Sequence, residues 1–153
     1  MTKLEFLTFN PSAYDIRLWN ENERNEPFTK AEFLKFNPDA YDICRWNENE
    51  RNEPFTKAEF LKINPSAYDI CRWNENERNE KIILFKNYKY YSSFYFSNSE
   101  WRIVMGCFNR SKDEWVADFW NNNKEFPNDG SEKSELRLKE FNRILKEIEK
   151  MAQ

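Results

Sequence analysis

Residues 29–53 read TKAEFLKFNPDAYDICRWNENERNE, and this stretch decides the fold because the chain contains it three times. Residues 56–80 read TKAEFLKINPSAYDICRWNENERNE, and residues 2–26 read TKLEFLTFNPSAYDIRLWNENERNE. The copies recur every 27 residues. A fixed period of this length is typical of solenoid proteins, in which each repeat buries its apolar face only by stacking on its neighbours. The sequence therefore predicts a stacked array.

Each copy contains the start signals of two helices. Thr29 with Glu32 three residues later is a capping-box pattern, which predicts a short helix of about two turns. Asn37 followed by Pro38 is typical of the N-cap and first position of a second helix, which we expect to run to Glu50. The link between the two is so short that the unit must be a helical hairpin.

The longer helix carries one apolar stripe. Ala40, Ile43, Cys44 and Trp46 lie within a broad face of a helix with 3.6 residues per turn, and we expect this face to pack between the copies. The three cysteines are an odd number and lack Cys-x-x-Cys spacing, so metal binding and disulfide pairing are not indicated. We expect all three to be buried free thiols: Cys44, Cys71 and Cys107.

Beyond residue 80 the composition changes to short runs of β-branched and aromatic residues. The runs KIILFK (81–86), YYSSFYF (90–96) and WRIVMGCF (101–108) predict a three-stranded antiparallel meander. Ser111 with Glu114 predicts a helix, and apolar residues on one face of residues 138–151 predict a last helix that lies on the sheet. The predicted fold is α+β, with three helical-hairpin repeats over residues 1–80 and a small α+β domain over residues 81–153.

Composition argues against catalysis. The chain has no histidine, which is the commonest general base and metal ligand, and only two glycines, which leaves little scope for a phosphate-binding loop. We therefore expect no enzyme activity, no catalytic residue, no metal and no cofactor. A subunit of a hydrolase completed by another chain remains a minor alternative, for which the many carboxylates are the only support.

Charge divides the chain. Residues 1–80 contain 11 lysines and arginines against 16 acidic residues, a net charge of −5, whereas residues 81–153 contain 13 against 11, a net charge of +2. Stacked repeats would place acidic side chains at regular intervals, and such a row would attract a basic protein surface. A solvated acidic face is the simpler interpretation. The predicted partner-binding residues are Glu21, Glu23, Glu48, Glu50, Glu53, Glu75, Glu77, Trp46 and Trp73.

A second function is direct binding of DNA or RNA. Basic and aromatic side chains alternate in the strand region, a mixture that suits single-stranded nucleic acid if the residues share one face of the sheet. The tyrosine and tryptophan series of the repeats could stack on bases or form the core. The residues predicted for this alternative are Arg45, Arg72, Lys86, Lys89, Tyr91, Tyr95 and Arg102.

The span from Glu32 to Asn47 resembles the short helical-hairpin repeats of phage and mobile-element proteins, which often accompany nuclease domains. The shared residues are Glu32, Phe33, Ala40, Tyr41 and Asn47. Those repeats tend to be basic with glycine in the turn, whereas these are acidic with Asn-Pro. The resemblance covers only the repeats and implies a phage or mobile-element origin.

The leading hypothesis is a non-catalytic inhibitor or nucleic-acid mimic. Its acidic array would dock on a basic surface of a nucleic-acid-handling protein, which for a phage protein would be a host defence factor. The alternative is a DNA- or RNA-binding module. The sequence shows no leader peptide and no apolar run of the roughly 18 residues that a membrane span needs, so we expect a cytoplasmic protein with no membrane partner.

Overall fold

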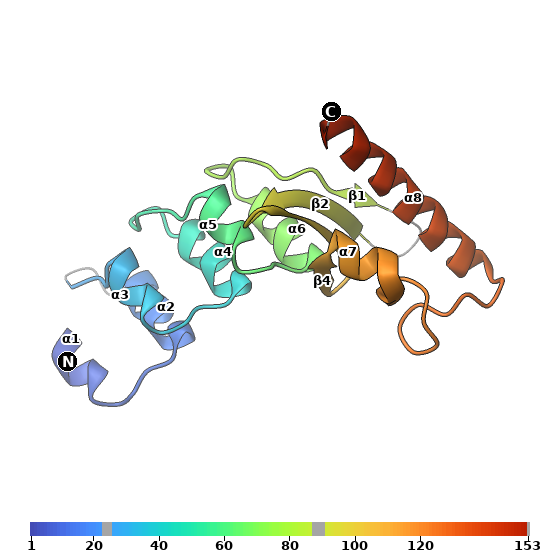
Figure 1. Cartoon of the computed structure of the whole chain (residues 1–153). Helices are drawn as coiled ribbons and strands as arrows, with labels where there is room; N and C mark the ends of the chain where they lie inside the picture. The colour runs from blue at the N-terminus through green and yellow to red at the C-terminus, as the bar shows by residue number, and fades with distance from the viewer. Residues whose placement is uncertain (23–25, 87–90, 153) are drawn as a thin grey trace.

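The computed structural model describes residues 1–22, 26–86 and 91–152, and shows an elongated molecule in which the repeats, a sheet and a last helix follow one another (Figure 1). In this part of the chain, the long helices of the repeats pack side by side, α2 on α4 and α4 on α6. The predicted array of three hairpins is confirmed. Its helix pairs are α1 (Lys3–Leu7) with α2 (Ala13–Asn22), α3 (Lys30–Leu34) with α4 (Ala40–Glu48), and α5 (Lys57–Leu61) with α6 (Ala67–Glu75).

The short helices begin where the capping pattern predicts. Thr29 Oγ1 accepts a hydrogen bond from the backbone N–H of Glu32, and the Glu32 carboxylate accepts one from the backbone N–H of Thr29 at 2.9 Å. Thr56 and Glu59 repeat this reciprocal pair in the third copy. Because both bonds satisfy N–H groups that a helix start leaves open, the local sequence is enough to place these helices.

The predicted start of the long helices is wrong by two residues. Asn37 has a left-handed backbone with φ of 51°, and Pro38 precedes the helix. The N-cap is Asp39, whose carboxylate accepts a hydrogen bond from Asp42 N–H at 2.7 Å and whose own N–H donates to Asp42. Asparagine tolerates the left-handed region better than most residues, so Asn37 turns the chain after the short helix and does not cap the long one.

A buried asparagine ties each long helix to the segment that follows. Asn47 Nδ2 donates to the Phe55 carbonyl at 3.0 Å, and Asn47 Oδ1 accepts from Phe55 N–H at 2.7 Å. The same amide donates to Asn79 Oδ1 in the next repeat at 3.0 Å. A buried polar group without a partner costs about 1–3 kcal/mol, so these bonds favour one stacking register. The first repeat has the same contacts at Asn20, Phe28 and Asn52.

The second part contains an antiparallel sheet with strand order β1-β2-β3-β4 in the described residues. Each predicted run contains a strand, and the third run divides at Gly106, where a φ of +64° allows a tight turn and creates the additional strand β4. The elements are β1 (Phe85–Lys86), β2 (Tyr91–Ser97), β3 (Glu100–Met105), β4 (Phe108–Ser111), α7 (Lys112–Glu114), a π-helical turn (Trp115–Phe119) and α8 (Glu132–Ala152).

Side chains of the central strands alternate between two cores. Tyr95 and Val104 face the repeats and belong to the array's apolar core, whereas Phe94 and Ile103 face α8 and belong to a second core. The sheet therefore lies between the third hairpin and α8 (Figure 1). It covers the face of the last repeat, as a capping element of a solenoid must.

Polar contacts fasten this cover to the third repeat. The Gly106 carbonyl accepts a hydrogen bond from Ala67 N–H at 2.8 Å, so the turn between β3 and β4 satisfies a donor at the start of α6. Asn109 Nδ2 donates to the Pro65 carbonyl at 2.7 Å. Both contacts join residues about 40 positions apart, and sequence patterns do not reveal them.

The cysteines are free, as predicted, but only one of them is buried. Cys44 lies in the core of the array, Cys71 is half-buried and Cys107 is exposed in the turn after β3. Burial raises the pKa of the Cys44 thiol far above its ordinary value and raises that of Cys71 in the same direction. The prediction that Cys71 and Cys107 are buried is wrong, because the sheet replaces a fourth repeat beside Cys71 and a tight turn exposes Cys107.

Helix α8 is amphipathic. Its buried face contains Phe141, Ile144 and Ile148, which pack on the sheet as predicted. Charged residues such as Glu135 and Glu149 lie on its exposed face. Among the residues that the structure describes, no helix has a stretch long and apolar enough to cross a bilayer.

Candidate protein-binding surface

The long helices share an outer face that repeats along the array. On α4 it carries Tyr41, Arg45 and Glu48, which lie at positions i, i+4 and i+7 and therefore on one side of the helix. We call the nine equivalent residues the helix face. They are Tyr14, Leu18 and Glu21 on α2, Tyr41, Arg45 and Glu48 on α4, and Tyr68, Arg72 and Glu75 on α6.

Ion pairs connect the helix face from one repeat to the next. Glu48 accepts a hydrogen bond from Arg45 Nη1 at 2.7 Å and another from Arg72 Nη2 at 3.0 Å, so one carboxylate joins α4 to α6. The bond to Glu48 raises the pKa of Arg72 above its ordinary value. Glu21 joins α2 to α4, at 3.2 Å from Arg17 and 3.9 Å from Arg45. The two pairs that cross a repeat boundary, Arg72 with Glu48 and Arg45 with Glu21, each join residues 24 positions apart in the sequence.

The predicted acidic row is therefore only partly open. The side chains of Glu21 and Glu48 are each 27% exposed to solvent, and both are paired with arginines. Glu75 is more exposed but lies 3.3 Å from Arg72. Glu23 lies outside the described residues. Three further predicted glutamates follow the helix ends, are exposed and form no ion pair within the described residues; we call them the acidic edge, and they are Glu50, Glu53 and Glu77.

An open hollow of about 470 Å³ joins the helix face to the acidic edge. Three carboxylates and two guanidinium groups line it, so its lining has a net charge of −1. It brings together residues of the first and second repeats, including four that the sequence analysis selected. A basic side chain of a partner that enters this hollow would meet the carboxylate of Glu50, whereas those of Glu21 and Glu48 are already paired with arginines. The lining residues are Glu21, Arg45, Glu48, Asn49, Glu50 and Arg51.

The two predicted tryptophan contacts are wrong. Trp46 and Trp73 are each 1% exposed and form part of the core. The Trp46 ring stacks on Phe33 with centroids 4.4 Å apart, and its indole N–H donates to the Glu53 carbonyl at 2.7 Å. Trp46 lies three residues after the buried Ile43 and therefore shares its stripe. Helical periodicity places this residue inside.

The tyrosines form the exposed aromatic series. Tyr14, Tyr41 and Tyr68 are 53%, 47% and 64% exposed, and they recur at the start of three consecutive long helices. Arg17 lies over the Tyr14 ring at 4.9 Å from its centroid. The same periodicity that buries the tryptophans could have identified these tyrosines as surface residues, because they do not share the stripe of the buried isoleucines.

The sheet does not present the predicted nucleic-acid surface. Tyr95 is 6% exposed, and its hydroxyl accepts a hydrogen bond from Asn109 at 2.7 Å. Burial raises the pKa of Tyr95. Arg102 donates to Asn109 and, at 2.7 Å, to Glu100. The prediction that Tyr95 contacts nucleic acid is therefore wrong, because this face of the sheet packs on the repeats. Arg102 is half-buried and engaged by Asn109 and Glu100.

The other residues of that alternative are dispersed. Tyr91 is half-buried against the core of the array. Arg45 and Arg72 are engaged by Glu48, as described above. The side chain of Lys86 and all of Lys89 lie outside the described part of the structure. The described residues thus do not assemble a basic, aromatic surface.

A smaller cavity of about 140 Å³ lies where α6, the turn after β3 and α8 meet. At its polar end Ser92 Oγ donates to Glu140 at 2.8 Å, and both residues are buried. The buried Arg137 donates to the Pro127 carbonyl at 3.1 Å and so holds the preceding loop to α8. Ser92 and Glu140 are thus paired with each other, and Arg137 is held by backbone carbonyls, so we assign the cavity to the packing of α8. Its apolar wall consists of Tyr68, Tyr91, Met105, Phe108 and Phe126.

The strongest candidate surface is therefore the helix face with the acidic edge and the hollow between them. Neither a scan of protein-family models nor searches of curated proteins and solved structures finds a match to this chain. The argument for function accordingly rests on the geometry of this surface.

Proposed function

We propose that the chain is a non-catalytic binding protein whose repeat array docks on a basic surface of a partner protein. The observation that carries the proposal is the hollow, which Glu21, Glu48 and Glu50 from two repeats line together with Arg45 and Arg51. Glu50 is exposed and forms no ion pair among the described residues. It therefore offers a full carboxylate to an incoming lysine or arginine.

Long-range electrostatics support a basic partner. The net charge of −5 on residues 1–80 persists although individual carboxylates are paired, because ion pairs do not alter the total. Such a field increases the rate of encounter with a positively charged surface. Basic surfaces are the usual mark of nucleic-acid-binding proteins, and an acidic array that covers one would act as an inhibitor. The likeness to phage repeats favours a partner of this class.

The tyrosines supply anchors for such a contact. Tyrosine and arginine are enriched among the residues that dominate binding energy. Tyrosine in particular buries a large area with few rotatable bonds. The stacked helices fix the backbone positions of these tyrosines before binding, which lowers the entropic cost of association.

The test is a pull-down in which each sample is treated with nuclease. The bait is the intact chain beside a triple variant of the acidic edge, Glu50→Lys, Glu53→Lys and Glu77→Lys. These glutamates are exposed and form no ion pair within the described residues, so the variant should keep its fold. The matched control makes the same change of charge on α8, at the exposed Glu132, Glu135 and Glu149.

We expect a protein that survives nuclease treatment with the native chain and the α8 control but is lost with the acidic-edge variant. Tyr41→Ser with Tyr68→Ser should weaken the same interaction without changing the net charge. Recovery of nucleic acid alone, strengthened by the added lysines, would replace this proposal with direct nucleic-acid binding.

A further inference from the structure

The stacking contacts of the array have a direction, which one lysine–glutamate pair makes visible. Lys30 Nζ of the second repeat donates to Glu59 of the third at 2.7 Å. Lys3 of the first repeat donates to Glu32 of the second at 2.8 Å. A repeat therefore presents a lysine on its forward face, which is the face towards the next repeat in the sequence. It presents a glutamate on its backward face, which is the face towards the preceding repeat. Glu5 is the backward glutamate of the first repeat; it is exposed, and its carboxylate has no partner among the described residues.

A second pair of charges follows the same direction. Asp42 of the second repeat lies 3.8 Å from Arg17 of the first. Its equivalent in the first repeat is Asp15, whose carboxylate accepts hydrogen bonds only from its own neighbour Ser12 in the described structure. The backward face of the first repeat thus carries two carboxylates, Glu5 and Asp15. Glu5 lacks the lysine that Glu32 and Glu59 have. Asp15 resembles Asp69 of the third repeat, which accepts hydrogen bonds only from Ser66 in the described structure, because Cys44 stands where the first repeat has Arg17.

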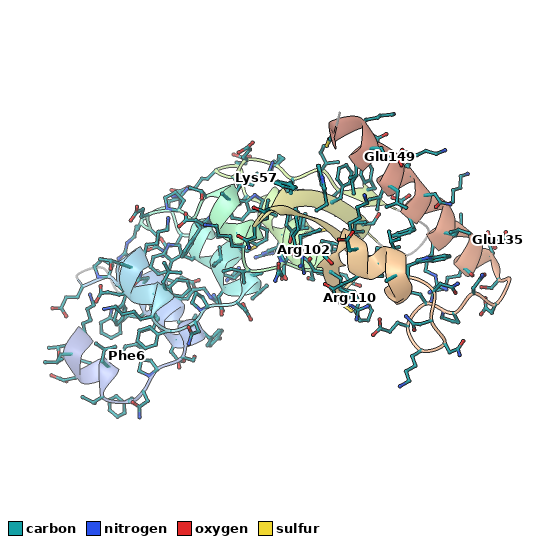
Figure 2. All side chains as sticks on the ribbon, in the orientation of Figure 1. Phe6, Lys57, Arg102, Arg110, Glu135 and Glu149 are labelled. Carbon is teal, nitrogen blue, oxygen red and sulfur yellow. The ribbon has the colours of Figure 1, made fainter. Side chains whose placement is uncertain are left out.

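The apolar part of this face is uncovered as well. Phe33 and Trp46 of the second repeat are buried, whereas their equivalents Phe6 and Trp19 are only partly covered. An open hollow of about 300 Å³ lies over the first repeat and is lined by Phe6, Asp15, Leu18, Trp19 and Asn22. Figure 2 shows Phe6 at the end of the molecule opposite to Glu149 of α8.

We propose that this end face is a second binding site, and that its occupant is a helical hairpin of the same repeat chemistry carried by a partner chain. Two properties of the face select this occupant. Its apolar hollow continues the stacking interface already formed twice within the array. Its Glu5 carboxylate matches the forward lysine of such a hairpin, as Glu32 matches Lys3.

A second copy of this chain does not fit the face. The forward faces of its first and second repeats are covered by the next repeat, and the forward face of the third is covered by the sheet. Pairing two end faces with each other would bring Glu5 and Asp15 of both copies into one interface, where like charges repel. The site therefore selects a different chain with an open forward face.

The experiment uses a labelled peptide with the sequence of residues 29–55, which contains one hairpin and the following Pro-Phe. Binding to the intact chain is measured by fluorescence anisotropy at low salt. Glu5→Lys should weaken binding about tenfold, and a peptide in which Lys30 is replaced by Glu should restore it. Glu135→Lys on α8 is the matched control and should bind like the native chain. The acidic-edge variant should also bind normally, which separates this site from the proposed function.

A tethered version removes the cost of bringing a short peptide to the face. Residues 29–55 inserted between Met1 and Thr2 continue the 27-residue period without a change of register. We expect the melting temperature to rise by about 5 °C or more, and amide exchange in α1 and α2 to slow. Binding of the free peptide with charge-swap rescue supports the site. Absence of rescue, or stabilisation only by the tethered hairpin, overturns the assignment to a partner chain.

Discussion

The two ends of the repeat array differ although the repeats are nearly identical. At the third repeat, the Asn74 side chain donates to the Ile82 carbonyl and accepts from Ile82 N–H, both at 2.8 Å. Asn47 makes the same contacts with Phe55, although Ile82, unlike Phe55, lies outside the repeats. The sheet then takes the place of a fourth hairpin. At the first repeat, the described residues leave Phe6 and Trp19 partly open. Each repeat thus has an apolar stacking face that must be covered, and either another hairpin or a sheet can cover it.

The largest expected contrast is between equivalent tryptophans at the two ends. Trp73→Ala should lower the free energy of unfolding by about 3–5 kcal/mol, because a fully buried ring is removed beneath the sheet. Trp19→Ala should cost less than half of that, because Trp19 is already partly exposed. Urea unfolding followed by circular dichroism measures both. Equal losses would mean that the first repeat is covered as well as the third.

The asparagine clamps test whether the interior junction and the junction with the sheet are equally strong. Asn47→Leu leaves the buried N–H and carbonyl of Phe55 without partners and removes the bond to Asn79, so we expect a loss of about 1–3 kcal/mol. Asn74→Leu should cost less, because Asn74 is half-buried and water can replace it. Thermal and urea unfolding of both variants decide this, and a larger loss at Asn74 would contradict the comparison.

Lysine substitutions probe the direction of stacking with smaller effects. Lys30→Met should destabilise the chain by about 0.2–1 kcal/mol, and added salt should reduce the difference from the native chain. Lys57→Met should have less effect, because Lys57 lies 3.7 Å from Glu80 and is more exposed than Lys30. Unfolding at low and high ionic strength provides the measurement. A salt-independent loss at Lys30 would attribute its role to its packing over Phe55.

Acid should weaken the repeat junctions slightly. The hydrogen bond from Lys3 holds the pKa of Glu32 below its ordinary value, and the bonds from Lys30 and Thr56 outweigh burial to lower that of Glu59. These carboxylates therefore stabilise the fold above their unfolded pKa of about 4.3, and the contribution is lost as pH falls through the lower folded value. Stability measured between pH 6 and 3 should fall less steeply in Lys3→Met, and an unchanged slope would exclude this pair as a cause.

Local chemistry explains which features could be predicted. The capping box of Thr29 and Glu32 and the apolar stripe of the long helix depend on residues three to four positions apart, and both appear as expected. The start of the long helix was predicted wrongly because Asn-Pro resembles a helix start, whereas the left-handed Asn37 makes it the end of the preceding turn. The exposed tyrosines and buried tryptophans were also separable by period, although the prediction chose the wrong series as partner contacts.

The sequence by itself determined the repeat, its hairpins and the acidic balance, because period, capping and charge are properties of short segments. Only the tertiary structure decided which glutamates remain open. Arg72 meets Glu48 across a repeat boundary, and the sheet lies over the third repeat, because these contacts depend on how stacked elements approach in space. Whether a surface glutamate is open or paired depends on neighbours that are distant in the sequence, and the stacking of the repeats decides which neighbours these are.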